Sequence, residues 1–145
     1  MKNPFRDKIV VVTGGASGIG RATAMRFAMS GSKIALLDFD PNTLKKTAGE
    51  FAEQGFPVFT GKCDVSNQEE VTAAIEAVIS HYGGIDILFN NAGITQRSSF
   101  VATDISVYRR VMDVNFFGAV YCTRAAIDSI IRRKGMIIIT SSIAG

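Results

Sequence analysis

The sequence predicts an α/β fold of the doubly wound kind, in which helices cover both faces of one parallel sheet. Short runs rich in Val and Ile alternate with helical segments along the chain, and this alternation is typical of right-handed βαβ units. The runs show little alternation of polar and apolar residues, as expected for strands covered on both faces. The length of 145 residues corresponds to one domain, since domains usually hold about 100–200 residues.

The first three elements follow from two apolar runs and a glycine. Residues 8–13 form a Val-rich run, which predicts the first strand. Residues 18–30 carry apolar side chains near helical spacing, and Gly31 ends this helix because glycine readily adopts the conformation that closes helices. Residues 33–38 are again mostly apolar and predict the second strand.

The next three elements are marked by capping residues. The helix over 41–54 begins with proline, whose missing N–H costs nothing at that position. A shorter strand is expected at 57–60. Ser66 is expected to cap the third helix, with Glu69 completing a capping box, and this helix ends near Tyr82.

The last elements surround a loop. Residues 86–90 predict the fourth strand, and a loop through Ser99 leads to one long helix over about 104–134. Residues 136–140 are uncharged and rich in β-branched side chains, which predicts the fifth strand.

Composition and charge exclude several classes of protein. Hydrophobic residues make up 47% of the chain and charged residues 20%, which excludes a disordered chain. No apolar run approaches the ~20 residues that span a bilayer, and no signal-peptide core is recognised, so we expect a cytoplasmic protein without a membrane partner. The net charge of +3 is mild, and the basic cluster at 132–134 fits a helix C-terminus better than a nucleic-acid surface.

Several chemically interesting residues are better explained by structure than by function. Cys63 and Cys122 show no metal-ligand spacing, so we expect two reduced, packed thiols and no metal site. The only histidine, His81, lies near a helix end and fits a capping or surface role. The aromatic pair Phe116–Phe117 is expected in the core or in a subunit contact, and Asp113 is interpreted as a structural acid.

The strongest functional signal follows the first strand. The segment from Thr13 to Gly20 reads Thr-Gly-Gly-Ala-Ser-Gly-Ile-Gly and runs directly into a helix. Glycines let a pyrophosphate approach the backbone, and the helix N-terminus offers free N–H groups. Asp38 ends the second strand, 18 residues after Gly20, where its carboxylate can accept hydrogen bonds from ribose hydroxyls. Strand, turn, helix and acid in this order predict a nucleotide site.

The spacing Thr-Gly-x-x-x-Gly-x-Gly resembles that of the short-chain dehydrogenase/reductase family, and three further segments agree. Residues 90–93 resemble the family's Asn-Asn-Ala-Gly motif, Asn115 its helical asparagine and Ser142 its serine after the fifth strand. The resemblance covers the chain from about Asp7 onward. It implies a Rossmann-like sheet of five strands in the order 3-2-1-4-5. It also implies one dinucleotide-binding domain over residues 1–145, from which the C-terminal part of the family domain is absent.

The resemblance further implies a nicotinamide dinucleotide lying across the strand ends. Asp64 would accept a hydrogen bond from the adenine amine, and Val65 would pack on the adenine ring. Catalytic roles would fall to Asn115, which supports a water relay, and to Ser142, which orients the substrate carbonyl. The residues implied around the pyrophosphate and the adjoining ribose belong to the glycine-rich turn: Gly14, Ser17, Gly18, Ile19 and Gly20. Asn91, Ala92 and Gly93 are implied to pass close to the adenosine ribose and the centre of the sheet.

The surroundings of Asp38 favour NAD over NADP as the cofactor. A 2′-phosphate beside its carboxylate would cost on the order of 4 kcal/mol per unit charge at ~4 Å and an effective dielectric of about 20. No cation stands where NADP-preferring members of the family often carry one, since Phe39 and Asp40 follow Asp38 and the turn reads Ala-Ser at 16–17. Arg21 lies one turn into the helix and is interpreted as structural.

The family's acid/base pair, Tyr-x-x-x-Lys, does not occur in these 145 residues, because Asp, Met and Ala stand four positions after Tyr82, Tyr108 and Tyr121. One hypothesis is an oxidoreductase acting on an alcohol or carbonyl substrate, with its C-terminal half outside this chain. The other is a non-catalytic NAD-binding fragment or interaction module. We favour the first, because a binding module does not need Asn115 and Ser142. The resemblance also implies a homo-oligomer that assembles through the long helix.

Overall fold

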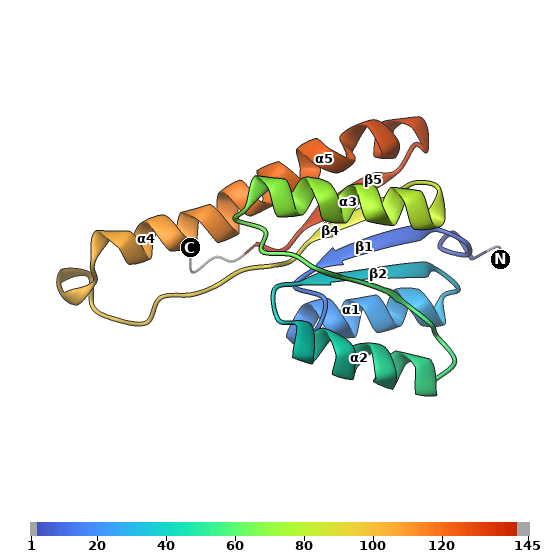
Figure 1. The fold of residues 1–145 in the computed structure, drawn as a ribbon, viewed down its shortest axis with the longest axis horizontal. Coiled ribbons are helices and arrows are strands. Elements are labelled where there is room, and N and C mark those ends of the chain that lie inside the picture. Colours follow the sequence, from blue (N-terminus) through green and yellow to red (C-terminus); the bar gives the residue numbers. More distant parts are fainter. Residues whose placement is uncertain (1–2, 142–145) are drawn as a thin grey trace.

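A computed structural model of the chain describes residues 3–141 and confirms the predicted fold. Five parallel strands form one sheet in the order β3-β2-β1-β4-β5 (Figure 1). The strands are β1 (Ile9–Thr13), β2 (Lys33–Asp38), β3 (Phe59–Lys62), β4 (Ile87–Asn90) and β5 (Met136–Ile139). The main helices are α1 (Gly18–Met29), α2 (Pro41–Glu53), α3 (Gln68–Tyr82), α4 (Ile105–Met112) and α5 (Gly118–Arg132).

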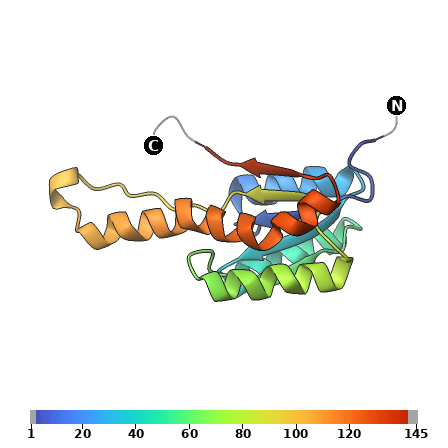
Figure 2. The same ribbon diagram turned by 90° about the horizontal axis from the view of Figure 1, so that it is seen from above.

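Helices cover both faces of the sheet (Figures 1 and 2). All five residues of β1 are buried at the centre of the sheet. Val10 and Val12 pack in the core formed with α1 and α2, whereas Val11 packs in the core formed with α3 and α5. Side chains of β1 point alternately into the two cores, which explains why its first four residues, 9–12, are all apolar.

Strand β3 begins two residues later than the sequence predicts, at Phe59 instead of residue 57. The reason is the side chain of Tyr82 at the end of α3. Its hydroxyl accepts a hydrogen bond from the Phe59 N–H at 3.2 Å and donates one to the Ile34 carbonyl at 3.0 Å. The tyrosine thus bridges β2 and β3 at the point where their backbone pairing begins.

The N-terminus of α3 also differs from the prediction, because Asn67 and not Ser66 caps the helix. The Asn67 side-chain oxygen accepts hydrogen bonds from the N–H groups of Glu69 and Glu70 at 3.0 and 3.2 Å. The Ser66 hydroxyl is engaged elsewhere, since it donates to the Asp64 carboxylate at 2.7 Å. The predicted capping residue is therefore wrong by one position.

The predicted long helix over 104–134 is interrupted by a π turn at Asp113–Phe117, which separates α4 from α5. In Figures 1 and 2, α4 extends beyond the carboxyl ends of the strands. The side chains of Phe116 and Phe117 are 52% and 41% exposed, so the expectation that they belong to the core of this chain is wrong. Their alternative interpretation, a subunit contact, stays a prediction.

Asp86 lies just before β4, whose strand pairing begins one residue later than predicted. Its buried carboxylate accepts hydrogen bonds from the Ile9 N–H at 2.9 Å, Arg133 at 3.0 Å and Lys8 at 3.3 Å. Burial by itself would raise the pKa of Asp86, but these hydrogen bonds outweigh it and hold the pKa below its ordinary value. Arg133, from the basic cluster at 132–134, therefore forms an ion pair with Asp86.

Both cysteines are buried free thiols in the core between the sheet and helices α3 and α5. Burial raises the pKa of Cys63 to about 11 and that of Cys122 to about 12. The prediction of packed thiols is confirmed.

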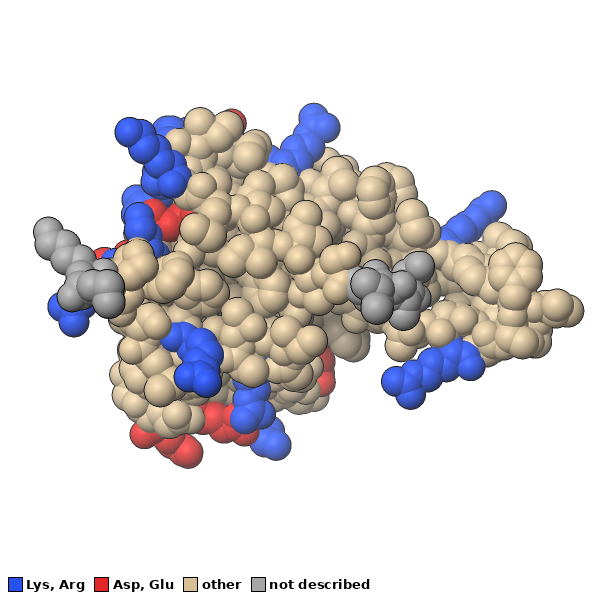
Figure 3. All heavy atoms as spheres, turned by 180° about the vertical axis from the view of Figure 1, so that it is seen from behind, with Lys and Arg blue, Asp and Glu red and all other residues tan. Residues whose placement is uncertain are grey.

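Within residues 3–141, no helix combines the length and the apolar character needed to cross a membrane. On the face seen in Figure 3, most Lys and Arg side chains lie toward the margin, and uncharged residues cover the centre.

Candidate functional site

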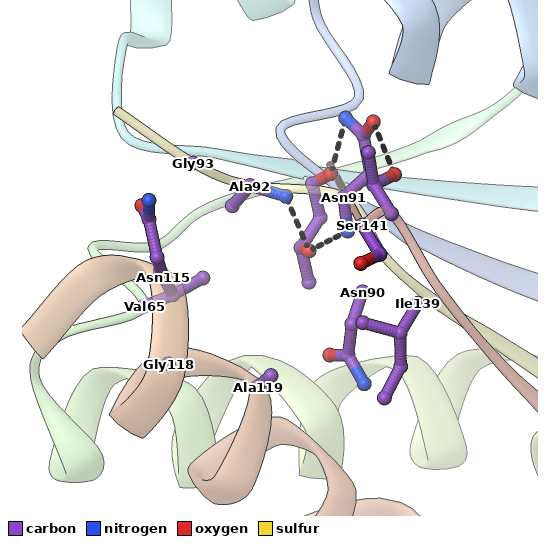
Figure 4. Close-up of a pocket in the computed structure, with 12 residues that line it drawn as sticks. Val65, Asn90, Asn91, Ala92, Gly93, Asn115, Gly118, Ala119, Ile139 and Ser141 are labelled. Atoms are coloured by element: carbon purple, nitrogen blue, oxygen red, sulfur yellow. Dashed lines mark hydrogen bonds between the residues drawn. The ribbon is translucent and has the colours of Figure 1, made fainter. Parts of the chain in front are cut away.

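The carboxyl ends of β1, β4 and β5 open onto a cavity of about 350 Å³. Residues 90–93 and 139–141 line it on the side of the sheet, and Asn115, Gly118 and Ala119 line it from the π turn and α5 (Figure 4). The strand order reverses between β1 and β4, and ligands of doubly wound sheets bind at such a reversal. The cavity therefore lies where the fold predicts a ligand.

The glycine-rich turn lies beside this reversal and leaves its backbone accessible. Gly14 and Gly18 have φ angles of +59° and +52°, which favour glycine, and a Cβ at Gly18 would meet only open space. Ser17 begins α1 without a side-chain cap, whereas Asp40, Asn67 and Asp104 cap α2, α3 and α4. The first N–H groups of α1 are thus available to an anion.

Gly20 lies on the inner side of this turn. A Cβ there would overlap the Gly14 carbonyl and lie 2.5 Å from the Asn91 side-chain nitrogen. Glycine at this position thus allows α1 to pack directly against the turn and β4. Ile19, in contrast, is 65% exposed, so the structure places it at the surface of the predicted pyrophosphate site.

Asp38 ends β2 and holds the glycine-rich turn in place. One carboxylate oxygen accepts a hydrogen bond from the Ala16 N–H at 3.1 Å, and the other accepts one from the Asp40 N–H at 3.3 Å. Each carboxylate oxygen can accept a second hydrogen bond. The side chain can therefore shape the turn and still accept from ribose hydroxyls.

Asn91 joins the ends of three strands. Its side-chain nitrogen donates to the carbonyls of Thr13 and Gly14, both at 3.2 Å, and its oxygen accepts from the Thr140 hydroxyl at 3.1 Å. The Thr13 hydroxyl in turn accepts from the N–H groups of Asn91 and Ala92 at 3.0 and 3.1 Å. Sequence reasoning missed Thr13 and Thr140 as site residues, although both stand at strand ends.

Asn115 lies in the π turn, and its side chain faces the segment that carries Gly93 (Figure 4). Its oxygen accepts from the Ile94 N–H at 2.8 Å, and its nitrogen donates to the Ile94 carbonyl at 2.9 Å. The amide thus pairs with the loop backbone as a neighbouring strand would. In this structure Asn115 positions the loop after β4 against the helix.

Replacing Asn115 by Ala is expected to loosen this loop. The two hydrogen bonds are exposed, so we expect the free energy of unfolding to fall by about 1–2 kcal/mol, at about 0.5–1.5 kcal/mol for each bond. Urea denaturation measures this loss, and hydrogen exchange of the Ile94 amide should become faster. Thr95→Ala in the same loop is the control, and equal effects of both variants would contradict the proposed pairing.

The Asp64 carboxylate is already engaged by three donors. One oxygen accepts from the Ser66 N–H at 3.0 Å and the Ser66 hydroxyl at 2.7 Å, and the other accepts from Arg110 of α4 at 3.0 Å. Burial would raise the pKa of Asp64, but the bonds from Ser66 and Arg110 outweigh it and lower the pKa. Val65 is buried, only 6% exposed, and packs closely on Gly118. A Cβ added to Gly118 would lie 2.7 Å from the Val65 side chain.

Arg110 had no recognisable signal in the sequence, since an arginine on a helix normally faces solvent. Asn90 is also engaged, since its side-chain nitrogen donates to the Thr123 hydroxyl at 3.1 Å. Its buried side-chain oxygen has no hydrogen-bond partner among residues 3–141. Ser141 lines the cavity, but Ser142 lies outside the described residues.

His81 packs against Phe59 and Tyr82, away from the cavity. Residues 3–141 contain no cluster of metal-ligating side chains.

The chain resembles several known proteins in sequence and structure. It is 42% identical to the Mycobacterium tuberculosis protein named "Probable oxidoreductase EphD" over 142 residues, which are 97% of this chain and 24% of that protein. A short chain dehydrogenase/reductase from Burkholderia phymatum in complex with NAD matches with a TM-score of 0.92 and 31% identity, over 97% of this chain and 50% of that one. NAD+-bound xylitol dehydrogenase matches with a TM-score of 0.92 and 35% identity, over 98% and 55%.

The sheet order and the position of the cavity define a Rossmann-like α/β protein that carries its site at the carboxyl ends of its strands. Residues 8–145 match the family model described as short chain dehydrogenase. The chain belongs to this family. It spans about a quarter of EphD and about half of the two structures.

Proposed function

We propose that the chain is the dinucleotide-binding domain, residues 1–145, of an NAD-dependent oxidoreductase acting on an alcohol or carbonyl substrate. The observation that carries the proposal is the glycine-rich turn over the uncapped start of α1, with Asp38 beside it. Bound NAD would supply the hydride acceptor, and NADH the donor. Two structural neighbours in which NAD is bound support the choice of cofactor.

The residues present fit such a dinucleotide. The N–H groups at the start of α1 would receive the pyrophosphate, because the Ser17 side chain does not cap them and the helix dipole favours an anion. Asp38 would accept from the ribose next to the adenine, and Asp64 and Val65 would border the base. The other residues proposed to surround the cofactor are Gly14, Ser17, Gly18, Ile19, Gly20, Asn91, Ala92 and Gly93.

Asn115 and Ser142 are the proposed catalytic residues of this chain. Asn115 holds the loop between β4 and α4, and Ser142 would orient the substrate oxygen. None of the three tyrosines is followed by lysine at the fourth position. We therefore propose that the acid/base pair comes from chain outside these 145 residues.

The same proposal includes a cytoplasmic homo-oligomer. Phe116, Phe117 and Val120 are 52%, 41% and 42% exposed along the π turn and α5. Such a row of apolar side chains on one helix suits a contact with a second copy of the chain.

A preference for NAD over NADP is the experimental test of the proposed cofactor. We expect NAD to bind at least about tenfold more tightly in isothermal titration calorimetry, because Asp38 repels a 2′-phosphate. Asp38→Ala should narrow this gap by removing the repulsion. Glu53→Gln, at the exposed end of α2, is the control with the same change of charge and should leave the gap unchanged. Tighter binding of NADP by the unmodified chain would refute the assignment.

A further inference from the structure

The amino ends of the strands carry a dense group of basic side chains, at the end of the sheet opposite the cavity. Backbone hydrogen bonds join the turns at this end. The Lys33 N–H donates to the Lys8 carbonyl at 2.8 Å, and the Met136 N–H donates to the Asp86 carbonyl at 2.9 Å. Basic side chains gather at this end, on the left of Figure 3. We call it the amino-end patch, and its basic residues are Arg6, Lys8, Arg26, Lys33, Arg132, Arg133 and Lys134.

Most of the positive charge of the amino-end patch is not neutralised. The Asp86 carboxylate pairs with two of the seven cations, and the other five form no ion pair with an acid among residues 3–141. Asp7 is the second acid of the patch, so cations exceed acids by five, and counting Glu53 and Asp128 at its border still leaves an excess of three. The whole chain has 16 cations and 13 acids, so acids outnumber cations outside the patch.

Helix ends explain only part of this cluster. Arg26 and Arg132 lie in the last turns of α1 and α5, where a cation suits the helix dipole. Lys134 follows α5 with a φ angle of +52°, in the left-handed region where glycine is favoured. The exposed lysine therefore occupies a backbone position that glycine would adopt with less strain. A charged side chain at such a position indicates a role outside the fold.

Apolar side chains lie exposed between these cations. Met29 at the end of α1, Ile131 at the end of α5 and Met136 at the start of β5 are 62%, 66% and 48% exposed. The nearby rings of Phe5 and Phe27 pack edge to face, with centroids 5.3 Å apart, and offer no open platform for nucleic-acid bases. An anionic lipid surface, in contrast, attracts cations through its headgroups and accepts apolar side chains at the acyl boundary.

We propose that the amino-end patch docks the chain on an anionic lipid bilayer, with the cavity at the carboxyl ends of the strands facing away from the lipid. Clusters of about 4–8 Lys or Arg side chains are typical of such contacts. The sequence predicts no membrane partner because no apolar run spans a bilayer, but contact with headgroups needs no such run. The inference goes beyond the proposed function and does not depend on it, since the patch and the cavity lie at opposite ends of the strands.

Co-sedimentation with lipid vesicles tests the proposal. The chain should bind vesicles made of one part phosphatidylserine and about two parts phosphatidylcholine, and it should not bind phosphatidylcholine alone. Binding to the anionic vesicles should weaken as salt rises from ~0.1 to ~0.5 M, because salt screens exposed charges. Binding that is equal for both kinds of vesicle would overturn the proposal.

Two double variants with the same change of charge locate the contact. Arg132→Gln with Lys134→Gln should weaken binding to the anionic vesicles about 25-fold, at about fivefold for each cation near the surface. Arg97→Gln with Arg109→Gln, exposed cations of the loop after β4 and of α4, is the control. It should weaken binding less than about threefold, because these charges lie farther than a Debye length from the lipid. Equal losses for both double variants would refute docking through the patch.

Lys134→Gly separates docking from a structural role. Glycine relieves the left-handed backbone, so the variant should unfold at a higher temperature than the unmodified chain. It should nevertheless bind the anionic vesicles about fivefold more weakly, because one cation is lost. Higher stability with unchanged binding would contradict the proposal.

Tryptophan fluorescence shows which end meets the lipid, because the chain contains no tryptophan. Anionic vesicles should shift the emission of Ile131→Trp, within the patch, to shorter wavelength. They should leave Phe100→Trp unchanged, since Phe100 is also exposed, at 80%, but lies before α4 at the other end. A shift for Phe100→Trp alone, or release of the vesicles by polyglutamate or polyuridylate at equal charge concentration, would overturn the proposal in favour of the opposite end or of a water-soluble polyanion.

Discussion

Replacing Gly20 by Ala is expected to destabilise the chain and to weaken NAD binding by more than about tenfold. The added Cβ would overlap the Gly14 carbonyl and lie 2.5 Å from the Asn91 side-chain nitrogen. Neither group can yield easily, because one is backbone and the other is hydrogen-bonded to the Thr13 and Gly14 carbonyls. We expect the free energy of unfolding to fall by about 2–3 kcal/mol, near the upper end for overpacking.

Urea denaturation measures the stability of this variant, and calorimetry measures its affinity for NAD. Gly49→Ala is the matched control, since Gly49 lies exposed in α2 and a Cβ there has no neighbour within 4 Å. That substitution should stabilise the chain by about 0.5–1 kcal/mol, because alanine is the better helix former. Unchanged stability and affinity of Gly20→Ala would show that the turn and α1 do not need this close approach.

The fold could be predicted from the sequence because each element depends on local patterns. The apolar run of β1 and the proline at the start of α2 lie where the sequence predicts them. The errors occur where a distant side chain decides the outcome. Tyr82, at the end of α3, determines where β3 begins through its hydrogen bonds. The Ser66 hydroxyl donates to Asp64, so Asn67 caps α3 in its place.

The candidate site could be predicted only as far as motifs describe it. The glycine-rich turn and Asp38 are recognisable because their spacing follows from the geometry of a strand, a turn and a helix. Asn91 is recognisable only because residues 90–93 resemble the family's Asn-Asn-Ala-Gly motif. The π turn around Asn115 has no comparable signature, since one additional residue in a helical turn leaves the apolar pattern nearly unchanged. The bond between Arg110 and Asp64 spans 46 positions, so no local pattern could reveal it.

Replacing Asp86 by Ala is expected to lower the free energy of unfolding by about 2–3 kcal/mol. The carboxylate is 3% exposed and bonds Arg133 and Lys8, whose side chains are 37% and 41% exposed. Loss of one partner from a fully buried ion pair costs about 3–5 kcal/mol, and the partial exposure of both cations reduces this cost. The Ile9 N–H would also lose its acceptor, which adds to the loss because this N–H begins the central strand.

The stability contributed by Asp86 should depend on pH in a defined direction. Hydrogen bonds from Arg133, Ile9 and Lys8 hold the pKa of Asp86 below its ordinary value despite burial. A carboxyl with a lower pKa in the folded state stabilises fully above its unfolded pKa of about 4 and loses this contribution as the pH falls through the folded value. The difference in unfolding free energy between the unmodified chain and Asp86→Asn should therefore be constant above about pH 5 and shrink below pH ~4. Asp128→Asn, an exposed substitution on α5, is the control, and its unfolding free energy should stay close to that of the unmodified chain at any pH. If the difference for Asp86→Asn instead grew as the pH fell, the lowered pKa of Asp86 in the folded chain would be contradicted.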